Sequence, residues 1–232
     1  GTSPCADDTE DVTLTVDNNP SLSSISETLC NTGSQFVDLA GLVIDGNSAG
    51  GAFTYFTSMA NAQNGTPTIT SVVSPIDDST FYVRSTTPAG CFDIVAVNII
   101  VNQPVTAGTG SSTSTCFATS GLTTITLADL LAGESTGGIW TVNSGAPGAN
   151  VDLGAGTLNP NNLAPGTYTF TYTVSGAAPC PNDDEDVTVT IHQVPELTTT
   201  PTSMCNDGLS NVNLAVQVVD NNAASGALTY YL

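Results

Sequence analysis

The chain carries one short stretch in repeated copies. One copy reads PCADDTEDVTLTV (residues 4–16), and another reads PCPNDDEDVTVTI (residues 179–191), 175 positions later. A shorter copy, GCFDIVAVNI, lies between them at residues 90–99. Each copy ends in apolar residues that alternate with polar ones, which is typical of a β-strand with one buried face. Because the cysteines of successive copies are 86 and 89 residues apart, the pattern indicates an array of modules.

The cysteines follow the same periodicity. Only one histidine is present, so zinc ligation by a mixture of Cys and His is not indicated. Paired, evenly spaced cysteines then predict disulfides, which persist outside the cytoplasm, and we expect an extracellular protein. In each pair the second cysteine follows the first by 25 positions, the pairs being Cys5 and Cys30, Cys91 and Cys116, and Cys180 and Cys205.

The charge balance excludes several classes of partner. The chain has 21 acidic residues against one basic side chain, Arg84, and its net charge is -20. Nucleic-acid binding depends on Lys and Arg, and adsorption to anionic lipid depends on them too, so neither is expected. With 40% hydrophobic and only 9% charged residues, the chain should nevertheless fold. The sequence has no apolar run of membrane-spanning length, so membrane insertion is not expected.

Strand signals dominate the rest of the chain. Runs of Val, Ile, Thr, Tyr and Phe, bounded by Gly, Pro, Asn and Ser clusters, recur about every ten residues, whereas helical periodicity is almost absent. We therefore predict an all-β protein of tandem immunoglobulin-like β-sandwich modules arranged end to end. The expected divisions are the last strand of a preceding module at 1–19, complete modules at 20–102 and 103–194, and the first strands of a following module at 195–232. Such divisions imply a section of a longer protein.

A large apolar residue recurs on the third expected strand of each module. GGAFT at residues 50–54 corresponds to GGIWT at 137–141 and to GALT at 226–229. A bulky side chain at this place packs against the opposite sheet of an immunoglobulin-like sandwich, so we expect core anchors at Phe53, Trp140 and Leu228. The stretch PGTYTFTY at 165–172 predicts a turn followed by the sixth strand, with its aromatic residues inward.

Taken together, these motifs resemble the tandem Ig-like or PKD-like repeats of very large secreted surface proteins of Bacteroidota, including gliding-motility adhesins. The resemblance rests on the cysteine ahead of the second strand, the glycine–aromatic third strand, the Pro-Gly-Thr-Tyr turn and the Cys-acidic-Val-Thr-Val last strand. Membership of such a family implies export through the outer membrane and display as a long fibre.

Two disulfide pairings are open. Cys30–Cys91 with Cys116–Cys180 would give each module its own bridge, but the two cysteines of a module then lie at opposite poles of a plain immunoglobulin-like topology. The alternative is a junction staple, Cys30–Cys180. It would join the head cysteine of one module, which lies near its start (Cys30), to the tail cysteine of the next, which lies near its end (Cys180). The remaining cysteines would then require partners in further modules. Pairing at the 25-residue spacing is disfavoured, because a last strand followed by a first strand carries the two sulfurs far apart.

Two acidic runs, expected in loops, also have two interpretations. Clustered carboxylates on loops are the ligands that Ca²⁺ needs, but neither run has EF-hand or RTX spacing. The alternative is a set of solvated acidic loops that keep a β-rich surface soluble. No other cofactor is expected. The candidate calcium ligands are Asp7, Asp8, Glu10 and Asp11 in one run and Asp183, Asp184, Glu185 and Asp186 in the other.

Catalytic and modification signals are few. The single histidine, His192, is expected at the outward end of a strand, so a hydrolase triad is not indicated, and Arg84 is expected at the surface. Asn64 lies in an N-glycosylation sequon, and Ser79 lies in a sequence that resembles the short O-glycosylation signal of Bacteroidota. We therefore predict a non-enzymatic protein.

The predicted function is that of a structural or adhesive segment of an extracellular, disulfide-reinforced surface fibre. Its expected partners are neighbouring modules of the same long chain, with lateral self-association into a filament as a further arrangement; no surface or glycan ligand is identified. The alternative is a carbohydrate-binding or spacer module of a secreted exoenzyme. The low aromatic content, 6%, argues against sugar platforms.

Overall fold

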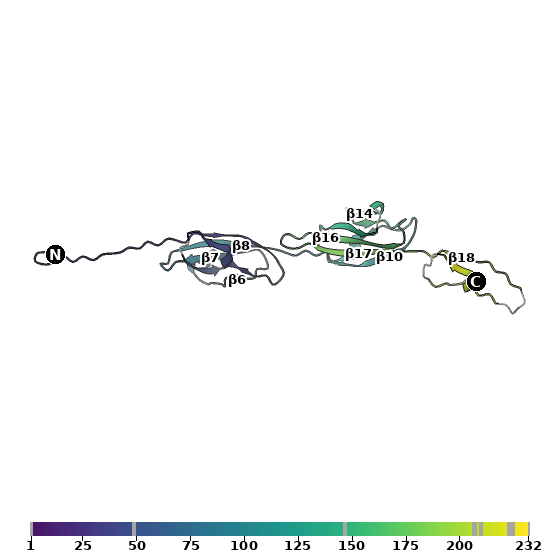
Figure 1. Ribbon diagram of the computed structural model, residues 1–232, viewed down its shortest axis with the longest axis horizontal. Helices are drawn as coiled ribbons and strands as arrows, with labels where there is room; N and C mark the ends of the chain where they lie inside the picture. Colours follow the sequence, from purple (N-terminus) through teal and green to yellow (C-terminus); the bar gives the residue numbers. More distant parts are fainter. Residues whose placement is uncertain are drawn as a thin grey trace. The chain divides into compact units, whose positions relative to one another are not determined.

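The computed structural model describes residues 2–47, 50–145, 148–205, 208, 211–221 and 226–231. The chain divides into two compact units. Unit 1 comprises residues 1–104 together with 177–180, and unit 2 comprises residues 105–176 and 181–232 (Figure 1). Both units are built almost entirely of strands.

Unit 1 is a sandwich of one four-stranded sheet against two short strand pairs. In the four-stranded sheet the order is β2 (Glu27–Cys30), β8 (Phe92–Asn102), β7 (Ser79–Thr86) and β5 (Ala52–Phe56). β2 runs parallel to β8, and the other neighbours are antiparallel. The facing layer consists of β1 (Leu22–Ser24) paired with β4 (Val43–Asp45) and β3 (Val37–Asp38) paired with β6 (Val72–Val73), with a 3-10 turn, η1, at Leu39–Leu42.

The core of unit 1 follows from strand alternation. On β7 and β8 every second residue faces the opposite layer, because successive side chains of a strand point to opposite faces. Val83, Val97 and Ile99 are buried there and pack with Leu39 and Val43 of the facing layer. This arrangement is the two-layer core expected of an immunoglobulin-like module.

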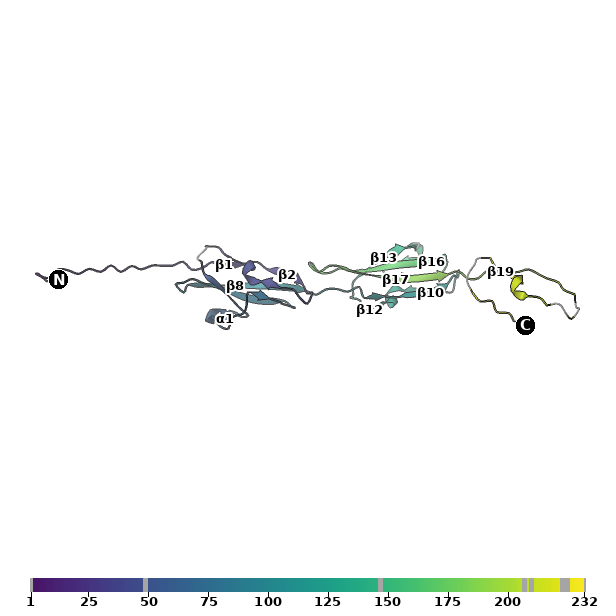
Figure 2. The same ribbon diagram turned by 60° about the horizontal axis from the view of Figure 1, so that its bottom comes forward.

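One short helix on unit 1 was not predicted. α1 (Met59–Asn64) begins after β5 and lies against β5, β7 and β8, at the periphery of the unit (Figure 2). Ser58 caps its N-terminus by accepting the Asn61 N–H at 3.2 Å, and Gly65 ends it in the left-handed conformation. Six residues are too short for a helical period to stand out in the sequence, and the caps are its only signal.

Unit 2 repeats this architecture with a fuller second sheet. Its four-stranded sheet has the order β10 (Ser112–Cys116), β17 (Asp183–His192), β16 (Gly166–Val174) and β13 (Ile139–Ser144). β10 runs parallel to β17, as β2 does to β8 in unit 1. The facing strands are β11 (Ile125–Thr126), β15 (Thr157–Leu158) and β14 (Val151–Asp152) in one sheet and β9 (Thr109–Gly110) with β12 (Leu131–Ala132) in another, with 3-10 turns η2 (Leu127–Leu130) and η3 (Gly148–Asn150).

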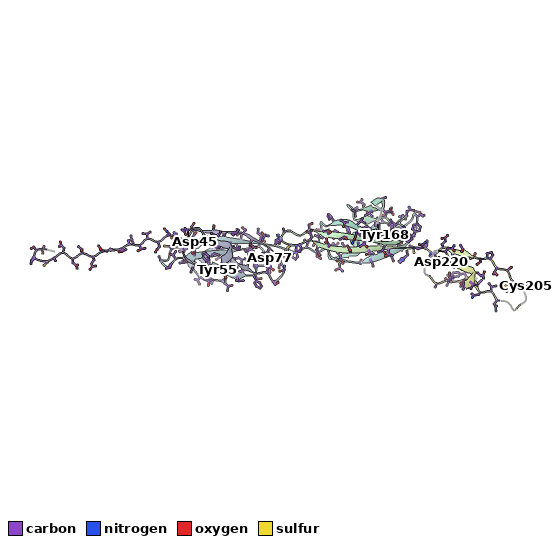
Figure 3. The ribbon with its side chains drawn as sticks, in the orientation of Figure 1. Asp45, Tyr55, Asp77, Tyr168, Cys205 and Asp220 are labelled. Carbon is purple, nitrogen blue, oxygen red and sulfur yellow. A yellow bond between two sulfur atoms is a disulfide. The ribbon has the colours of Figure 1, made fainter. Side chains whose placement is uncertain are left out.

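The core of unit 2 contains the aromatic residues expected on the sixth strand. Tyr168, Phe170 and Tyr172 are buried on one face of β16, opposite Leu127 and Leu158. The hydroxyl of Tyr168, labelled in Figure 3, donates to the backbone oxygen of Ala164 at 2.6 Å. A tyrosine at the start of this strand that bonds back to the preceding backbone is a mark of immunoglobulin-like sandwiches. The predicted all-β, immunoglobulin-like fold is confirmed.

The first strand of unit 2 changes sheets at a glycine. β9 pairs with β12, and two residues later β10 joins β17 in the other sheet. At Gly110 a Cβ atom would lie 2.0 Å from the backbone oxygen of Asp186. Only glycine lets the crossing chain approach β17 so closely.

The three predicted core anchors have different outcomes. Trp140 is buried in unit 2, whereas Phe53 is only partly buried and packs at the margin of the unit 1 core. Leu228 is wrong as an anchor, because 42% of its surface is exposed. Among the described residues of the C-terminal segment, only β18 (Leu197–Thr199) and β19 (Val218–Asp220) pair, with the turn η4 (Leu214–Gln217) between them, so Leu228 has no second sheet to pack against.

The N-terminal segment shows what the same strand sequence does without a sheet. Val12, Leu14 and Val16 are 94%, 85% and 83% exposed, and residues 6–19 belong to no strand in the described part of the chain. Their counterparts in the repeat, on β17, are at most 1% exposed. Partner strands, and not the alternating sequence alone, therefore decide whether this stretch is buried.

Candidate functional site

The structure contains one disulfide, Cys30–Cys180, among the described residues. The two Cα atoms are 4.9 Å apart, and the cysteines are separated by 150 positions in sequence. Cys30 is the last residue of β2, whereas Cys180 lies in the connection between β16 and β17. Residues 177–180 of that connection belong to unit 1, although the strands on either side of them belong to unit 2. Both cysteines of the bridge therefore lie in unit 1, and the chain on either side of residues 177–180 belongs to unit 2.

Hydrogen bonds around the bridge centre on Asn102, the residue opposite Cys30 at the end of β8. Its side-chain amide donates to the backbone oxygens of Ala177 and Ala178 at 3.3 and 2.7 Å, and its own backbone oxygen accepts from Asn31 N at 2.8 Å. The Cys180 N–H closes a turn by donating to Ala177 O at 2.8 Å. Asn102 thus holds the connection so that Cys180 faces Cys30. Nothing in the sequence indicated that the asparagine at this strand end has such a role.

Strand length explains why the within-module pairing does not occur. Cys91 immediately precedes β8, and Cys30 lies beside the last residue of β8, eleven residues further on. At about 3.3 Å per residue the two are separated by roughly 36 Å, far beyond the reach of a disulfide. Cys180 and Cys116 stand in the same relation to β17, since Cys116 pairs in register with His192 at its end. Of the two pairings considered, the structure contains the junction staple.

The four other cysteines occupy equivalent positions but are not bonded to one another. Cys116 ends β10 as Cys30 ends β2, and Cys91 precedes β8 as Cys180 precedes β17. Cys5 closes the same kind of turn as Cys180, since its N–H donates to Thr2 O at 2.9 Å. Cys5, Cys116 and Cys205 are exposed, and Cys91 is half-buried.

The acidic runs do not form a metal site among the residues described. Asp183 to Asp186 were expected in a loop, but they begin β17, so neighbouring carboxylates point to opposite faces of the sheet. Asp7, Asp8, Glu10 and Asp11 lie in the extended N-terminal segment, where all four are exposed. In the described part of the chain no three acidic, His or Cys side chains are grouped as metal ligands.

Two of the acidic residues in β17 instead accept backbone N–H groups of β9 and of the chain just before it. Asp183 Oδ2 accepts from Ala107 N at 2.8 Å, and Glu185 Oε1 accepts from Gly110 N at 2.9 Å. In unit 1, Asp93 Oδ2 accepts from Leu22 N, also at 2.8 Å. Asp93 is the one acidic residue of the shorter middle copy of the repeat. Where the first strand changes sheets, the carboxylate accepts a backbone N–H that would otherwise need a carbonyl of a neighbouring strand.

Arg84 is not a plain surface residue. It is half-buried, and its Nη1 donates to the oxygens of Ala62 and Gln63 at 3.1 and 3.3 Å. The guanidinium carbon lies 3.8 Å from the centroid of the Phe92 ring. A cation at the C-terminal end of α1 satisfies carbonyls that have no partner within the helix. Arg84 therefore has a structural role at the end of α1 that its expected surface position did not indicate.

The remaining candidates lie apart from the bridge. Asn64 is exposed at the end of α1, and Ser79 begins β7, where its Oγ donates to Asp77 O at 2.9 Å. Both stay predictions as glycosylation sites. His192 is exposed at the end of β17.

One half-buried tyrosine has a raised pKa. Burial, and secondarily the charge of Asp38, raises the pKa of the Tyr55 phenol on β5. Figure 3 labels this side chain within unit 1.

Residues 23–105 match a family model described as the Flavobacterium inter-domain disulphide bond domain. The description names a genus of the Bacteroidota, and the matched segment covers β2 to β8 of unit 1. Among curated proteins no match is found.

Several solved structures resemble part of the chain at low identity. The insect immune protein hemolin has a TM-score of 0.38 and 12% identity, over 75% of this chain and 46% of its own. Murine CEACAM1b has a TM-score of 0.38 and 15% identity, over 75% of this chain and 100% of its own. Drosophila N-cadherin EC1-4 has a TM-score of 0.36 and 14% identity, over 75% of this chain and 50% of its own. The fold assignment follows from the sheet order of each unit.

No helix in the described residues is long and apolar enough to cross a membrane.

Proposed function

We propose that this chain is a structural or adhesive section of an extracellular surface fibre, in which disulfides fasten successive immunoglobulin-like modules. The observation that carries the proposal is the Cys30–Cys180 bridge, which joins the end of β2 in one module to the β16–β17 connection of the next. Disulfides of this kind persist in oxidising surroundings outside the cell. The match of residues 23–105 to a domain described by an inter-domain disulfide supports the same function.

The equivalent cysteines extend the proposal along the chain. Cys116 stands in unit 2 where Cys30 stands in unit 1, and Cys91 stands where Cys180 stands in the following copy. Cys116 and Cys205 would then bond the tail cysteines of later modules, and Cys5 and Cys91 would bond the head cysteines of earlier ones. Each module would be tied to both neighbours, so the partners of this chain are further copies of its own module.

The bridge has a mechanical consequence that suits a fibre. Force applied to the two chain ends passes from Cys30 to Cys180 through the sulfur atoms and does not pass along the residues between them. A separation of 150 residues, at up to about 3.6 Å each, corresponds to roughly 500 Å of chain that cannot be pulled out while the bond is intact. Sheets within this closed loop are protected from extension even if they unfold.

Single-molecule force spectroscopy tests this function directly. The full chain is held by tags at its two ends, and its maximum extension is measured before and after addition of a thiol reductant. We expect reduction to lengthen the extended chain by roughly 500 Å. Cys180→Ser should show the long extension without reductant, whereas Cys116→Ser, which removes an equivalent but unbonded thiol, should keep the short one. Equal extensions in both redox states would contradict the proposal.

Electron microscopy of the native material addresses the assembly. Antibodies against unit 2 should label filaments outside the cell, either single beaded strands or thicker fibres formed by lateral association. Labelling confined to a secreted enzyme would instead favour the role of a spacer module.

A further inference from the structure

A pocket of about 450 Å³ opens on unit 2 beside the only tryptophan of the chain. It lies between the start of β13, the connection that precedes this strand and the turn that follows β14. Its walls include Trp140, Tyr172, Glu134, Ile139, Leu153 and Gly156. Small-molecule sites commonly have volumes of about 300 to 1,000 Å³ and combine apolar walls with a few polar groups. The bridge involves none of the residues that line this pocket.

The indole N–H of Trp140 is an unused donor at the pocket. Trp140 is only 9% exposed, yet its Nε1 donates to no acceptor among the described residues, and it is not among their fully buried unsatisfied atoms. The neighbouring Tyr172 hydroxyl, by contrast, is fully used: it donates to Ser135 O at 3.1 Å and accepts from Gly138 N at 2.9 Å. A nearly buried indole N–H usually has a hydrogen-bond partner. Here the space beside it is the pocket.

Gly156 keeps that donor accessible. A Cβ atom at this position would lie 2.8 Å from Trp140 Nε1, so any side chain would cover the N–H. The glycine has a φ of +62°, and the turn is fixed on both sides, because Gly156 O accepts from Leu127 N at 2.8 Å and Ala155 N donates to Asp152 Oδ1 at 2.9 Å. The opening is therefore formed by ordered backbone.

Glu134 supplies an acceptor at the wall of the same pocket. Its side chain is half-buried at the pocket wall, and its carboxylate accepts no hydrogen bond from the described residues. Ile139 and Leu153, 64% and 40% exposed, give the rim an apolar surface. A ligand must then offer an oxygen to the indole, hydroxyl groups to the carboxylate, and a C–H face to the rim. Glu134 and the net charge of -20 disfavour an anion.

We propose that this pocket binds a neutral sugar residue, with Trp140 Nε1–H donating to a sugar oxygen and the Glu134 carboxylate accepting sugar hydroxyls. A pyranose ring has both the polar edge and the apolar face that the walls require. The site belongs to unit 2 alone. In unit 1 the corresponding cross-strand pair is Phe53 and Ser85, in place of Trp140 and Tyr172, and it offers no indole donor.

The single tryptophan makes the test simple, because the chain gives one indole N–H signal in an NMR spectrum. The uniformly ¹⁵N-labelled full chain, with its disulfide intact, is titrated with cellobiose, maltose, xylobiose, chitobiose and galactose, each to 20 mM. We expect at least one sugar to move the Trp140 indole signal saturably. Absence of any shift with all five sugars would overturn the proposal.

Two matched variants separate a specific site from a general effect. Glu134→Gln removes the charged acceptor and should weaken binding about tenfold, the effect of losing one charge-assisted hydrogen bond. Asp129→Asn removes the same charge from an exposed residue of η2 outside the pocket, so the affinity should not change. Retained chemical-shift dispersion shows that both variants fold. Unchanged affinity in Glu134→Gln, or a shift produced by tetramethylammonium in place of sugar, would also overturn the proposal.

Discussion

Asp183 accepts the backbone N–H of Ala107 through Oδ2 at 2.8 Å, joining the start of the last strand of unit 2 to the chain that enters its first strand. In unit 1, Asp93 and Leu22 have the same relationship at the same distance. A hydrogen bond to a charged group contributes more to the free energy of unfolding than one between neutral groups. Its loss here would also leave the partly buried N–H of Ala107 unpaired. Asp183 and Asp93 therefore each stabilise the sandwich to which they belong.

Asp183→Ala should lower the free energy of unfolding of unit 2 by about 1 to 2 kcal/mol. Asp184→Ala is the matched control, since its side chain points to the exposed face of the same strand. Urea denaturation followed by Trp140 fluorescence measures unit 2, because this is the only tryptophan. Equal losses in the two variants would show that the contact with Ala107 is not what matters.

Much of this fold could be predicted from residue patterns. Alternation gave the strands of β16 and β17, and the repeated cysteines gave the modular array, because both depend on local periodicity. The role of the acidic run could not be predicted in this way. Whether Asp183 faces solvent or a backbone N–H depends on where the first strand crosses, and that is decided by Gly110 and the sheet change, far away in sequence.

The disulfide illustrates the same limit. Spacing alone left two pairings open, and the length of β8 decides between them by placing Cys91 and Cys30 at opposite ends of one strand. Phe53 was expected as the core anchor of unit 1 by its alignment with Trp140. α1 instead buries Phe56 on the other face of the sheet, which the alignment could not indicate.

Arg84 should prove essential for keeping α1 in place. Arg84→Ala removes two hydrogen bonds to the helix end and the contact with Phe92, and we expect a loss of about 2 kcal/mol in the stability of unit 1. Arg84→Lys keeps the charge but lacks the planar guanidinium group, so its stability should lie between those of the natural chain and Arg84→Ala. Hydrogen exchange at the Ala62 amide measures the effect. An unchanged exchange rate in Arg84→Ala would contradict this role.

The single basic residue also provides a simple test of the bridge. Trypsin acting on the denatured, alkylated but unreduced chain should cut only after Arg84, giving residues 1–84 and 85–232. Cys30–Cys180 should hold these fragments together until a reductant is added. Cys91→Ser should leave them linked and Cys180→Ser should release them, as mass spectrometry can show. Release by Cys91→Ser would mean that the within-module pairing forms in solution.

Tyr55 should make unit 1 sensitive to alkaline pH. Burial, and then the charge of Asp38, raises the pKa of its phenol in the folded state above the value of about 10 found in an unfolded chain. The folded state therefore holds this proton more tightly. Its contribution to stability is fully present below pH 10 and is lost as the pH rises through the folded pKa.

Urea denaturation of the chain and of Tyr55→Phe at pH 8 and pH 11 measures this contribution. The midpoint for unit 1 should fall more between the two pH values in the natural chain than in Tyr55→Phe, which has no proton to lose at this position. Asp38→Asn should reduce the fall without abolishing it, because burial is the larger cause of the shift. If Tyr55→Phe showed the same fall, alkaline unfolding of unit 1 would have to arise from other groups.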